Sequence, residues 1–257
     1  MGQSRQRLYR TEGIVIRHSD MGEADRVLVL YTPDRGKVRV VAKGVRRPGS
    51  RLAGHVELFT HSTFLLARGR SMDIVTQAQT VRAFAMLRQD LSRIGWAGYL
   101  IELLDRMAPE QAENLPAFQL LLEALEHLDL GRAPEMMARS YELHLLGSMG
   151  YRPQLFRCVS CEGELEARAH VFSPTLGGVL CPRCREQDMR ARALSLEALK
   201  VLRYLQRTGL DEAEQLQVGP TCRREIADLL YAYIRTILEC DLNAAEFLEA
   251  LEAARKG

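Results

Sequence analysis

The 257-residue sequence has no run of about eighteen uninterrupted apolar residues, the least that a membrane-crossing helix needs. Its first residues, MGQSRQRLYRTEG, include basic side chains but no apolar stretch after them, so no secretory signal is predicted. The sequence also lacks the phosphate-loop, dinucleotide-binding, nucleophile-elbow and HExxH motifs. These absences favour a binding protein over an enzyme and argue against a protein with membrane-spanning helices.

Carboxylates that could support catalysis gather only in the first predicted loop, at Asp20, Glu23 and Asp25. They could hold Mg²⁺, which leaves open a metal-dependent nuclease or hydrolase. No further carboxylate motif accompanies them, so a solvated turn is the preferred interpretation. The six histidines are scattered and have no recognisable nucleophile partner in the sequence.

The formal net charge of +2 conceals an uneven distribution of charge along the chain. Residues 1–82 contain 15 Lys and Arg against 7 Asp and Glu, a net of +8, and residues 83–257 have a net of −6. No acidic residue interrupts the seven basic ones between Arg35 and Arg51. Uncompensated positive charge of this kind is typical of a surface that binds phosphate.

The first eighty residues read as five short strands separated by turn signals. The strands are expected around Ile14–Ile16, Val27–Tyr31, Lys37–Lys43, Val56–Leu66 and Met72–Val81. The sequence Pro33-Asp34-Arg35-Gly36 suits a hairpin, because Pro presets one turn dihedral and Gly tolerates positive φ. Five such strands predict an oligonucleotide-binding (OB) barrel over residues 1–82, with an SH3-like barrel as the alternative.

An OB barrel binds its ligand on strands 2 and 3 and on the loops that join strands 1–2 and 4–5. Lys37 and Arg39 are two residues apart on strand 3 and therefore share a face, while Arg68 and Arg70 fall in the 4–5 loop. The predicted DNA-contacting residues are Arg10, Arg35, Lys37, Arg39, Lys43, Arg46, Arg47, Arg51, Arg68 and Arg70. Strands 2 and 3 offer only Tyr31 for base stacking, so contacts to the phosphate backbone are expected to dominate.

Residues 83–257 are predicted to form a helical domain. Apolar residues recur at spacings of three and four from Leu87 to Leu104. Further helices are expected at Pro116–Leu130, Pro134–Met149, Leu196–Leu205, Pro220–Leu238 and Asn243–Ala254. Ser195 is the expected N-cap of the third of these.

Four of the six cysteines form two CxxC pairs, Cys158 with Cys161 and Cys181 with Cys184, separated by nineteen residues. This is the spacing of a zinc ribbon, in which two tight turns aim four sulfurs at one ion. Four thiolates leave no open coordination position, so the zinc is expected to be structural and the insert to cover about residues 153–192. A disulfide framework and a redox pair are the alternatives, and His170 could replace one ligand.

These features together resemble the bacterial recombination mediator family RecO. The resemblance rests on TEGIVI near the start, MGEADRVLVLYTPDRGKVRVVAKGVRRPGSRLAG, and CVSC followed by FSPTLGGVLCPRC, and it covers essentially the whole chain. One departure is Glu162-Gly163 after Cys161, where a Gly often follows directly in the family.

The resemblance implies an N-terminal OB domain, a helical domain with the zinc module, and no enzymatic turnover. RecO-like proteins bind single- and double-stranded DNA, anneal complementary strands and, with RecR, help to load RecA on DNA coated by single-strand-binding protein (SSB). They also contact the SSB C-terminal tail through the helical domain, and they work in the cytoplasm on the nucleoid. The remaining alternative is a protein–protein adaptor whose basic domain binds an acidic partner.

Overall fold

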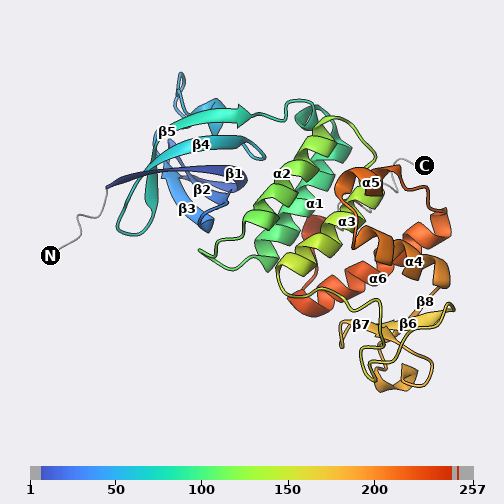
Figure 1. Cartoon of the computed structure of the whole chain (residues 1–257). Helices are drawn as coiled ribbons and strands as arrows, with labels where there is room; N and C mark the ends of the chain where they lie inside the picture. Colours follow the sequence, from blue (N-terminus) through green and yellow to red (C-terminus); the bar gives the residue numbers. More distant parts are fainter. Residues whose placement is uncertain (1–6, 245–247, 249–257) are drawn as a thin grey trace. The chain divides into compact units, whose positions relative to one another are not determined.

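Residues 7–244 and Leu248 are described by the computed structural model. Five strands at the start of the chain close into a barrel (Figure 1). They are β1 Leu8–Met21, β2 Asp25–Thr32, β3 Gly36–Ala42, β4 His61–Ala67 and β5 Asp73–Arg82. The order around the barrel is β1-β2-β3-β5-β4, and only the β3–β5 pair is parallel. The expectation of a five-stranded OB-type barrel is confirmed.

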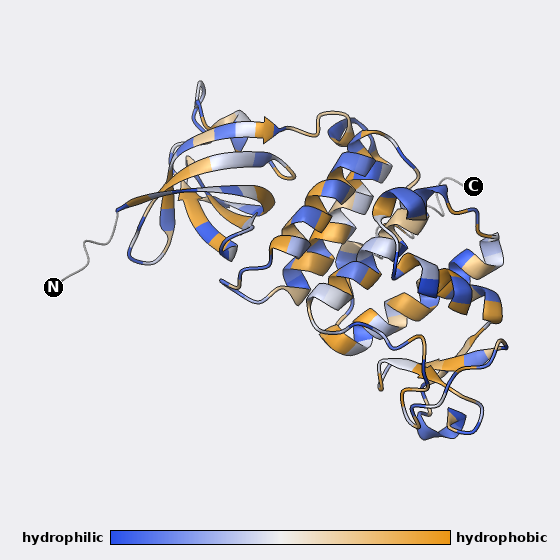
Figure 2. Ribbon diagram, viewed as in Figure 1, coloured by the Kyte–Doolittle hydropathy of each residue, from blue (hydrophilic) through white to orange (hydrophobic). Residues whose placement is uncertain are grey.

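The barrel core is formed by side chains at alternating strand positions, which point into the barrel. Leu28 and Leu30 on β2, Val40 on β3 and Phe64 and Leu66 on β4 are all inaccessible to solvent. Figure 2 shows the resulting mixture of apolar and polar residues along the strands. The β2–β3 turn has the expected form, because Gly36 adopts φ +60°.

Six α-helices are described after the barrel. They are α1 Leu91–Met107, α2 Leu115–Asp129, α3 Pro134–Ser148, α4 Leu196–Leu205, α5 Leu210–Gln215 and α6 Pro220–Leu238. Asp90 caps α1, and Ser195 caps α4 by accepting from the Ala198 N–H, as expected. The short α5 was not predicted, and the helix expected at Asn243–Ala254 lies mostly outside the described residues. None of the described helices has the length and apolar character that a membrane crossing requires.

The cysteine-rich insert contains a small sheet with the order β7-β6-β8. Its strands are β6 His170–Ser173, β7 Gly178–Leu180 and β8 Arg192–Leu194. β6 and β7 form an antiparallel hairpin between the two CxxC pairs, and β8, which follows the second pair, was not predicted. Three 3₁₀ turns complete the described elements: η1 Ala53–His55, η2 Leu87–Gln89 and η3 Arg185–Gln187.

The chain divides into two compact units. The described residues up to Ala97 form the first unit together with Ile101–Leu130, and Gly98–Leu100 with the described residues from Gly131 form the second. The first unit therefore extends beyond the end of β5, where the expected domain boundary lies, and includes α2 and most of α1. Side-chain contacts explain this extension, because α1 and the residues after it supply acidic partners to a lysine of β3.

Candidate nucleic-acid interface and candidate metal centre

The barrel exposes most of the basic residues that the sequence singles out. Eight of the ten side chains are exposed: Arg10, Arg39, Lys43, Arg46, Arg47, Arg51, Arg68 and Arg70. We call these eight residues the basic surface. Arg39 lies on β3, Lys43 directly follows it, and Arg68 and Arg70 occupy the β4–β5 loop. Lys43, Arg47 and Arg51 lie on residues 43–56, the acid-free part of the segment between β3 and β4.

Lys37 differs from its neighbours because its side chain is buried. Only 7% of the residue is exposed. Its Nζ donates to the Asp105 carbonyl oxygen at 2.8 Å and lies 3.5 Å from carboxylate oxygens of both Asp105 and Glu110. A buried ammonium that is already neutralised cannot reach a phosphate, so Lys37 does not belong to the basic surface.

The acidic loop between β1 and β2 packs against the basic segment after β3. Arg46 lies 3.4 Å from Asp20 and donates to the Gly22 carbonyl oxygen, while the Gly44 N–H donates to Asp25 at 2.7 Å. Asp20 also pairs with Arg26. Within residues 7–244, these carboxylates form no three-residue group with the ligand spacing of a metal site. Asp20 and Asp25 instead hold the loop against the segment that follows β3.

An aromatic residue that the sequence analysis missed organises two of the arginines. The Tyr9 ring lies 4.5 Å from the Arg35 guanidinium carbon and 5.2 Å from that of Arg68, within cation–π distance of both. The Tyr9 hydroxyl donates to Asp73, whose other oxygen accepts from the Gly69 N–H. Burial and Asp73 raise the pKa of Tyr9, so the phenol keeps the proton that it donates. The ring thus fixes Arg35 from the β2–β3 turn beside Arg68 from the β4–β5 loop.

Tyr31, the aromatic residue that strands 2 and 3 offered for stacking, is fully buried in the structure. Burial also raises its pKa to about 12. A base cannot stack on a ring that solvent does not reach. The exposed side chains of β2 and β3 are therefore consistent with the expectation that contacts to the DNA phosphate backbone outweigh base stacking there.

The four paired cysteines come together within the insert. The Sγ atoms of Cys158, Cys161, Cys181 and Cys184 all lie within 4.8 Å of one another. The Cys161 and Cys181 sulfurs are 3.8 Å apart, far longer than the ~2.05 Å of a disulfide bond. Zn–S bonds of about 2.3 Å in a tetrahedron place the sulfurs about 3.8 Å apart. The four side chains therefore fit one tetrahedral ion.

Three of the four thiols differ in pKa. Burial tends to raise the pKa of Cys158, but N–H groups of residues 160, 161 and 181 outweigh it and lower that pKa to about 6. Burial tends to raise the pKa of Cys181, but N–H groups of residues 184 and 183 lower it. A contact with Ser160 tends to lower the pKa of Cys184, but burial and the neighbouring sulfurs raise it to about 11.

His170 is buried and donates from Nε2 to the Glu166 carbonyl oxygen at 2.9 Å. That bond makes His170 part of the fold of the insert, outside the four-sulfur group.

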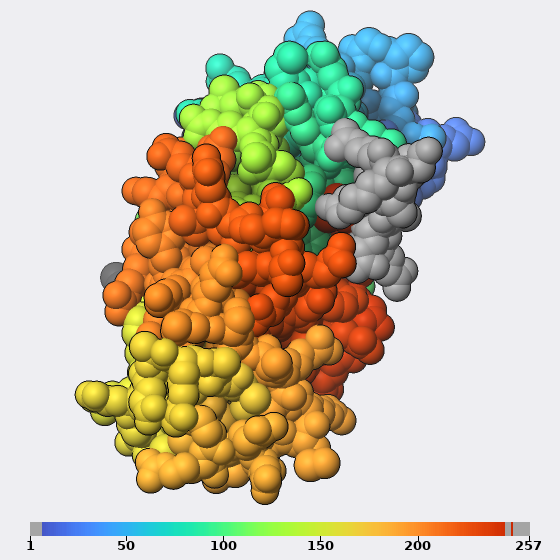
Figure 3. Space-filling model, turned by 90° about the vertical axis from the view of Figure 1, so that its right-hand side faces the viewer, coloured from blue at the N-terminus to red at the C-terminus, as the bar shows by residue number. Residues whose placement is uncertain are grey.

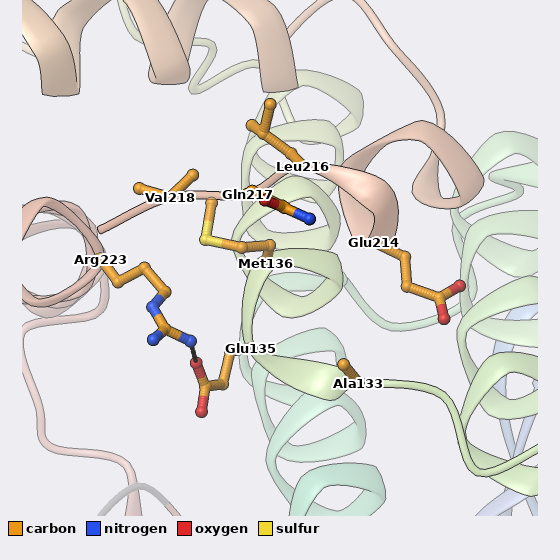
Figure 4. Close-up of a pocket in the computed structure, with 8 residues that line it drawn as sticks. All are labelled: Ala133, Glu135, Met136, Glu214, Leu216, Gln217, Val218 and Arg223. Carbon is orange, nitrogen blue, oxygen red and sulfur yellow. Dashed lines mark hydrogen bonds and ion pairs between the residues drawn. The ribbon is translucent and has the colours of Figure 1, made fainter. Parts of the chain in front are cut away.

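The second unit contains a pocket of about 290 Å³ beside α3 and α6 (Figure 4). Met136, Leu216 and Val218 give it apolar walls. Arg223 on its rim is paired with Glu135, as the dashed line in Figure 4 shows. Glu214 adds a second carboxylate to the lining. This pocket therefore offers no uncompensated cation to an anionic ligand.

Comparisons with known proteins agree with this architecture. Residues 6–84 match the family model "Recombination protein O N terminal", and residues 88–245 match "Recombination protein O C terminal". The DNA repair protein RecO of Roseiflexus sp. is 50% identical over 245 residues, which cover 95% of this chain and 86% of that protein.

Two further relatives extend the similarity to other bacteria. The DNA repair protein RecO of Symbiobacterium thermophilum is 40% identical, with 96% of this chain and 99% of that protein covered. That of Dehalococcoides mccartyi is 39% identical, with 96% and 97% covered. With both family models matched in order along a barrel and a helical region, the chain belongs to the RecO family of DNA repair proteins.

Proposed function

We propose that this chain is a non-enzymatic DNA-binding mediator of recombinational repair. It binds single- and double-stranded DNA without sequence specificity and anneals complementary strands. With RecR, it assists the loading of RecA on SSB-coated DNA, and it contacts the SSB C-terminal tail. The proposal places this activity in the cytoplasm, on the nucleoid. Membership of the RecO family supports each of these steps.

The observation that carries the DNA-binding part is the basic surface of the barrel. Lys43, Arg47 and Arg51 are exposed, and no acidic residue interrupts the segment that contains them. Such side chains neutralise phosphates and release counterions whatever the base sequence. A protein that anneals any pair of complementary strands needs this kind of contact, and the positive charge also lowers the repulsion between two strands.

We further propose that Cys158, Cys161, Cys181 and Cys184 hold one structural zinc ion. The fit of four sulfurs to a tetrahedron supports it. The metal would join the two CxxC turns and so stabilise the insert, which includes β6 and β7. It would have no open position for a substrate.

Charge reversal at Lys43, Arg47 and Arg51 tests the DNA-binding part. All three become Glu in one variant, and the loss of three phosphate contacts is expected to weaken binding of a labelled oligo-dT at least tenfold in moderate salt. The control reverses three exposed arginines of the second unit, Arg185, Arg190 and Arg224, for the same change in net charge.

Equal losses of affinity in the two variants would mean that net charge alone attracts DNA, and would contradict a defined interface. The adaptor alternative makes a different prediction. If the protein is an adaptor, the wild type would bind an acidic partner peptide, and added oligo-dT would not displace that peptide.

A further inference from the structure

Two arginines in the second unit share one aromatic ring, far along the chain from the barrel. Phe156 begins the cysteine-rich insert, and its ring centroid lies 5.2 Å from the Arg203 guanidinium carbon and 4.2 Å from that of Arg207. Arg203 lies in the last turn of α4, and Arg207 follows that helix. On the face shown in Figure 3, the yellow segment that begins the insert lies against the orange segment that contains α4.

Hydrogen bonds hold this cluster in place. The Arg203 Nε donates to the Leu155 carbonyl oxygen at 2.8 Å, and the buried Gln206 side chain donates to the Pro153 carbonyl oxygen at 2.9 Å. Phe156 and Arg203 are half-buried, whereas Arg207 is exposed. The ring and the bond to Leu155 therefore hold the Arg203 guanidinium, and the ring alone holds that of Arg207.

No acidic residue compensates these charges within either of the two segments that meet here. Residues 151–161 and 198–210 contain no Asp or Glu. Burial, and then repulsion by Arg207, lower the pKa of Arg203. Lys200 is exposed and lies on the same face of α4 as Arg203, one turn after the exposed Glu197, so the uncompensated charge is that of Arg203 and Arg207. Two guanidinium groups held together without a carboxylate are an arrangement that a bound anion would stabilise.

The paired arginines elsewhere in the second unit differ from this cluster. Arg223 is neutralised by Glu135, and Arg132 lies 2.6 Å from Asp211. The partial negative charge at the C-terminus of α4 accounts for part of the stabilisation of Arg203 in its last turn. It does not account for the second guanidinium that shares the Phe156 ring.

The barrel contains a related arrangement, in which Tyr9 holds Arg35 beside Arg68, although Arg35 also lies 3.3 Å from the Asp34 carboxylate. Guanidinium planes that stack on a ring keep edge N–H groups for phosphate oxygens, which they bind in pairs. An aromatic ring that holds two arginines therefore occurs in both units, and the pair at Phe156 is the one with no carboxylate partner among the described residues.

We propose that Phe156, Arg203 and Arg207 form a second nucleic-acid site, which binds the phosphate backbone of a single strand independently of the barrel. This inference rests on the proposed DNA-binding function and adds the site for a second strand. With one strand on each unit, the protein would bring two strands into proximity before they pair.

The experiment measures bridging of two strands by the full-length protein. Donor- and acceptor-labelled oligo-dT strands, which cannot pair with each other, report bridging by energy transfer, and anisotropy at low protein concentration reports binding of the first strand. Changing Arg203 and Arg207 to Glu is expected to reduce bridging about tenfold and first-strand affinity less than threefold. Arg190→Glu/Arg224→Glu is the control of equal charge and should bridge as the wild type does.

Conservative variants separate charge from folding. Arg203→Gln/Arg207→Gln removes the charge without reversing it and should lose bridging with an unchanged melting temperature. Phe156→Leu keeps both charges and should lose part of the bridging, because the guanidinium groups are no longer held together.

Wild-type bridging by both the Glu and the Gln variants would overturn the proposal. The proposal would also be overturned if the Arg203/Arg207 variants bridge two strands normally but no longer bind an acidic peptide. That result would assign the cluster to a protein partner. These outcomes are distinct from a failure of the barrel interface, which would appear as wild-type first-strand binding in the Lys43→Glu/Arg47→Glu/Arg51→Glu variant.

Discussion

At the residue scale, two lysines only six positions apart have different roles. Lys37 is buried against Asp105 and Glu110, whereas Lys43 is exposed with no acidic residue nearby in the sequence. The charge pattern of the sequence treats the two alike, because both lie in the same acid-free run. Only the residues that pack onto β3 from more than sixty positions later separate a buried, ion-paired lysine from an exposed one.

The same substitution at the two positions tests this difference. Lys37→Met leaves the Asp105 carbonyl oxygen without its buried donor, while Arg17 and Arg39 still pair with the Asp105 and Glu110 carboxylates. The variant should therefore lose about 1–3 kcal/mol of unfolding free energy. Its affinity for oligo-dT should change less than twofold. Lys43→Met should leave stability within about 0.5 kcal/mol and weaken binding about threefold. Denaturant unfolding and anisotropy measure the two quantities, and the reverse pattern would place the DNA interface on the Lys37 side.

At the scale of elements, the sequence predicts most of the structure where local signals are strong. Ser195 and Pro220 mark the starts of α4 and α6, and the turn at Pro33–Gly36 joins β2 to β3 as expected. The strand β8 escapes prediction because its three residues owe their conformation to pairing with β6. The Tyr9 cluster escapes it as well, since its two arginines come from turns that only barrel closure brings together.

The cysteine insert is the element whose stability should depend on a ligand. Removal of zinc by a strong chelator, or Cys181→Ser, leaves the remaining thiolates without a shared cation and should destabilise the second unit. Metal analysis should give about one zinc per wild-type chain, and melting should show the loss of stability. Cys240→Ser, at a cysteine outside the four-sulfur group, is the control and should keep the metal.

The barrel should keep its function without the metal, because its basic surface lies in the other unit. Oligo-dT affinity after chelation is therefore expected to stay within about twofold of the starting value. Purified protein that contains no zinc and melts as the metal-loaded protein does would contradict a structural zinc site.

At the scale of the whole molecule, an almost neutral chain combines two regions of opposite charge. Residues 1–82 carry a net of +8 and residues 83–257 a net of −6. Under the proposed function, this distribution concentrates phosphate attraction on the barrel, and the cluster of Phe156, Arg203 and Arg207 is the proposed exception in the second unit. Binding strength should therefore follow the charges of particular surfaces and not the net charge of +2.

The salt dependence of single-strand binding tests the central claim most directly. If about five phosphates are neutralised, the logarithm of the oligo-dT affinity should fall against the logarithm of salt concentration with a slope near −3.5. The Lys43→Glu/Arg47→Glu/Arg51→Glu variant loses about three of these contacts, and its slope should be about −1.4. A wild-type affinity that does not change with salt, or a variant slope equal to that of the wild type, would contradict binding through the basic surface of the barrel.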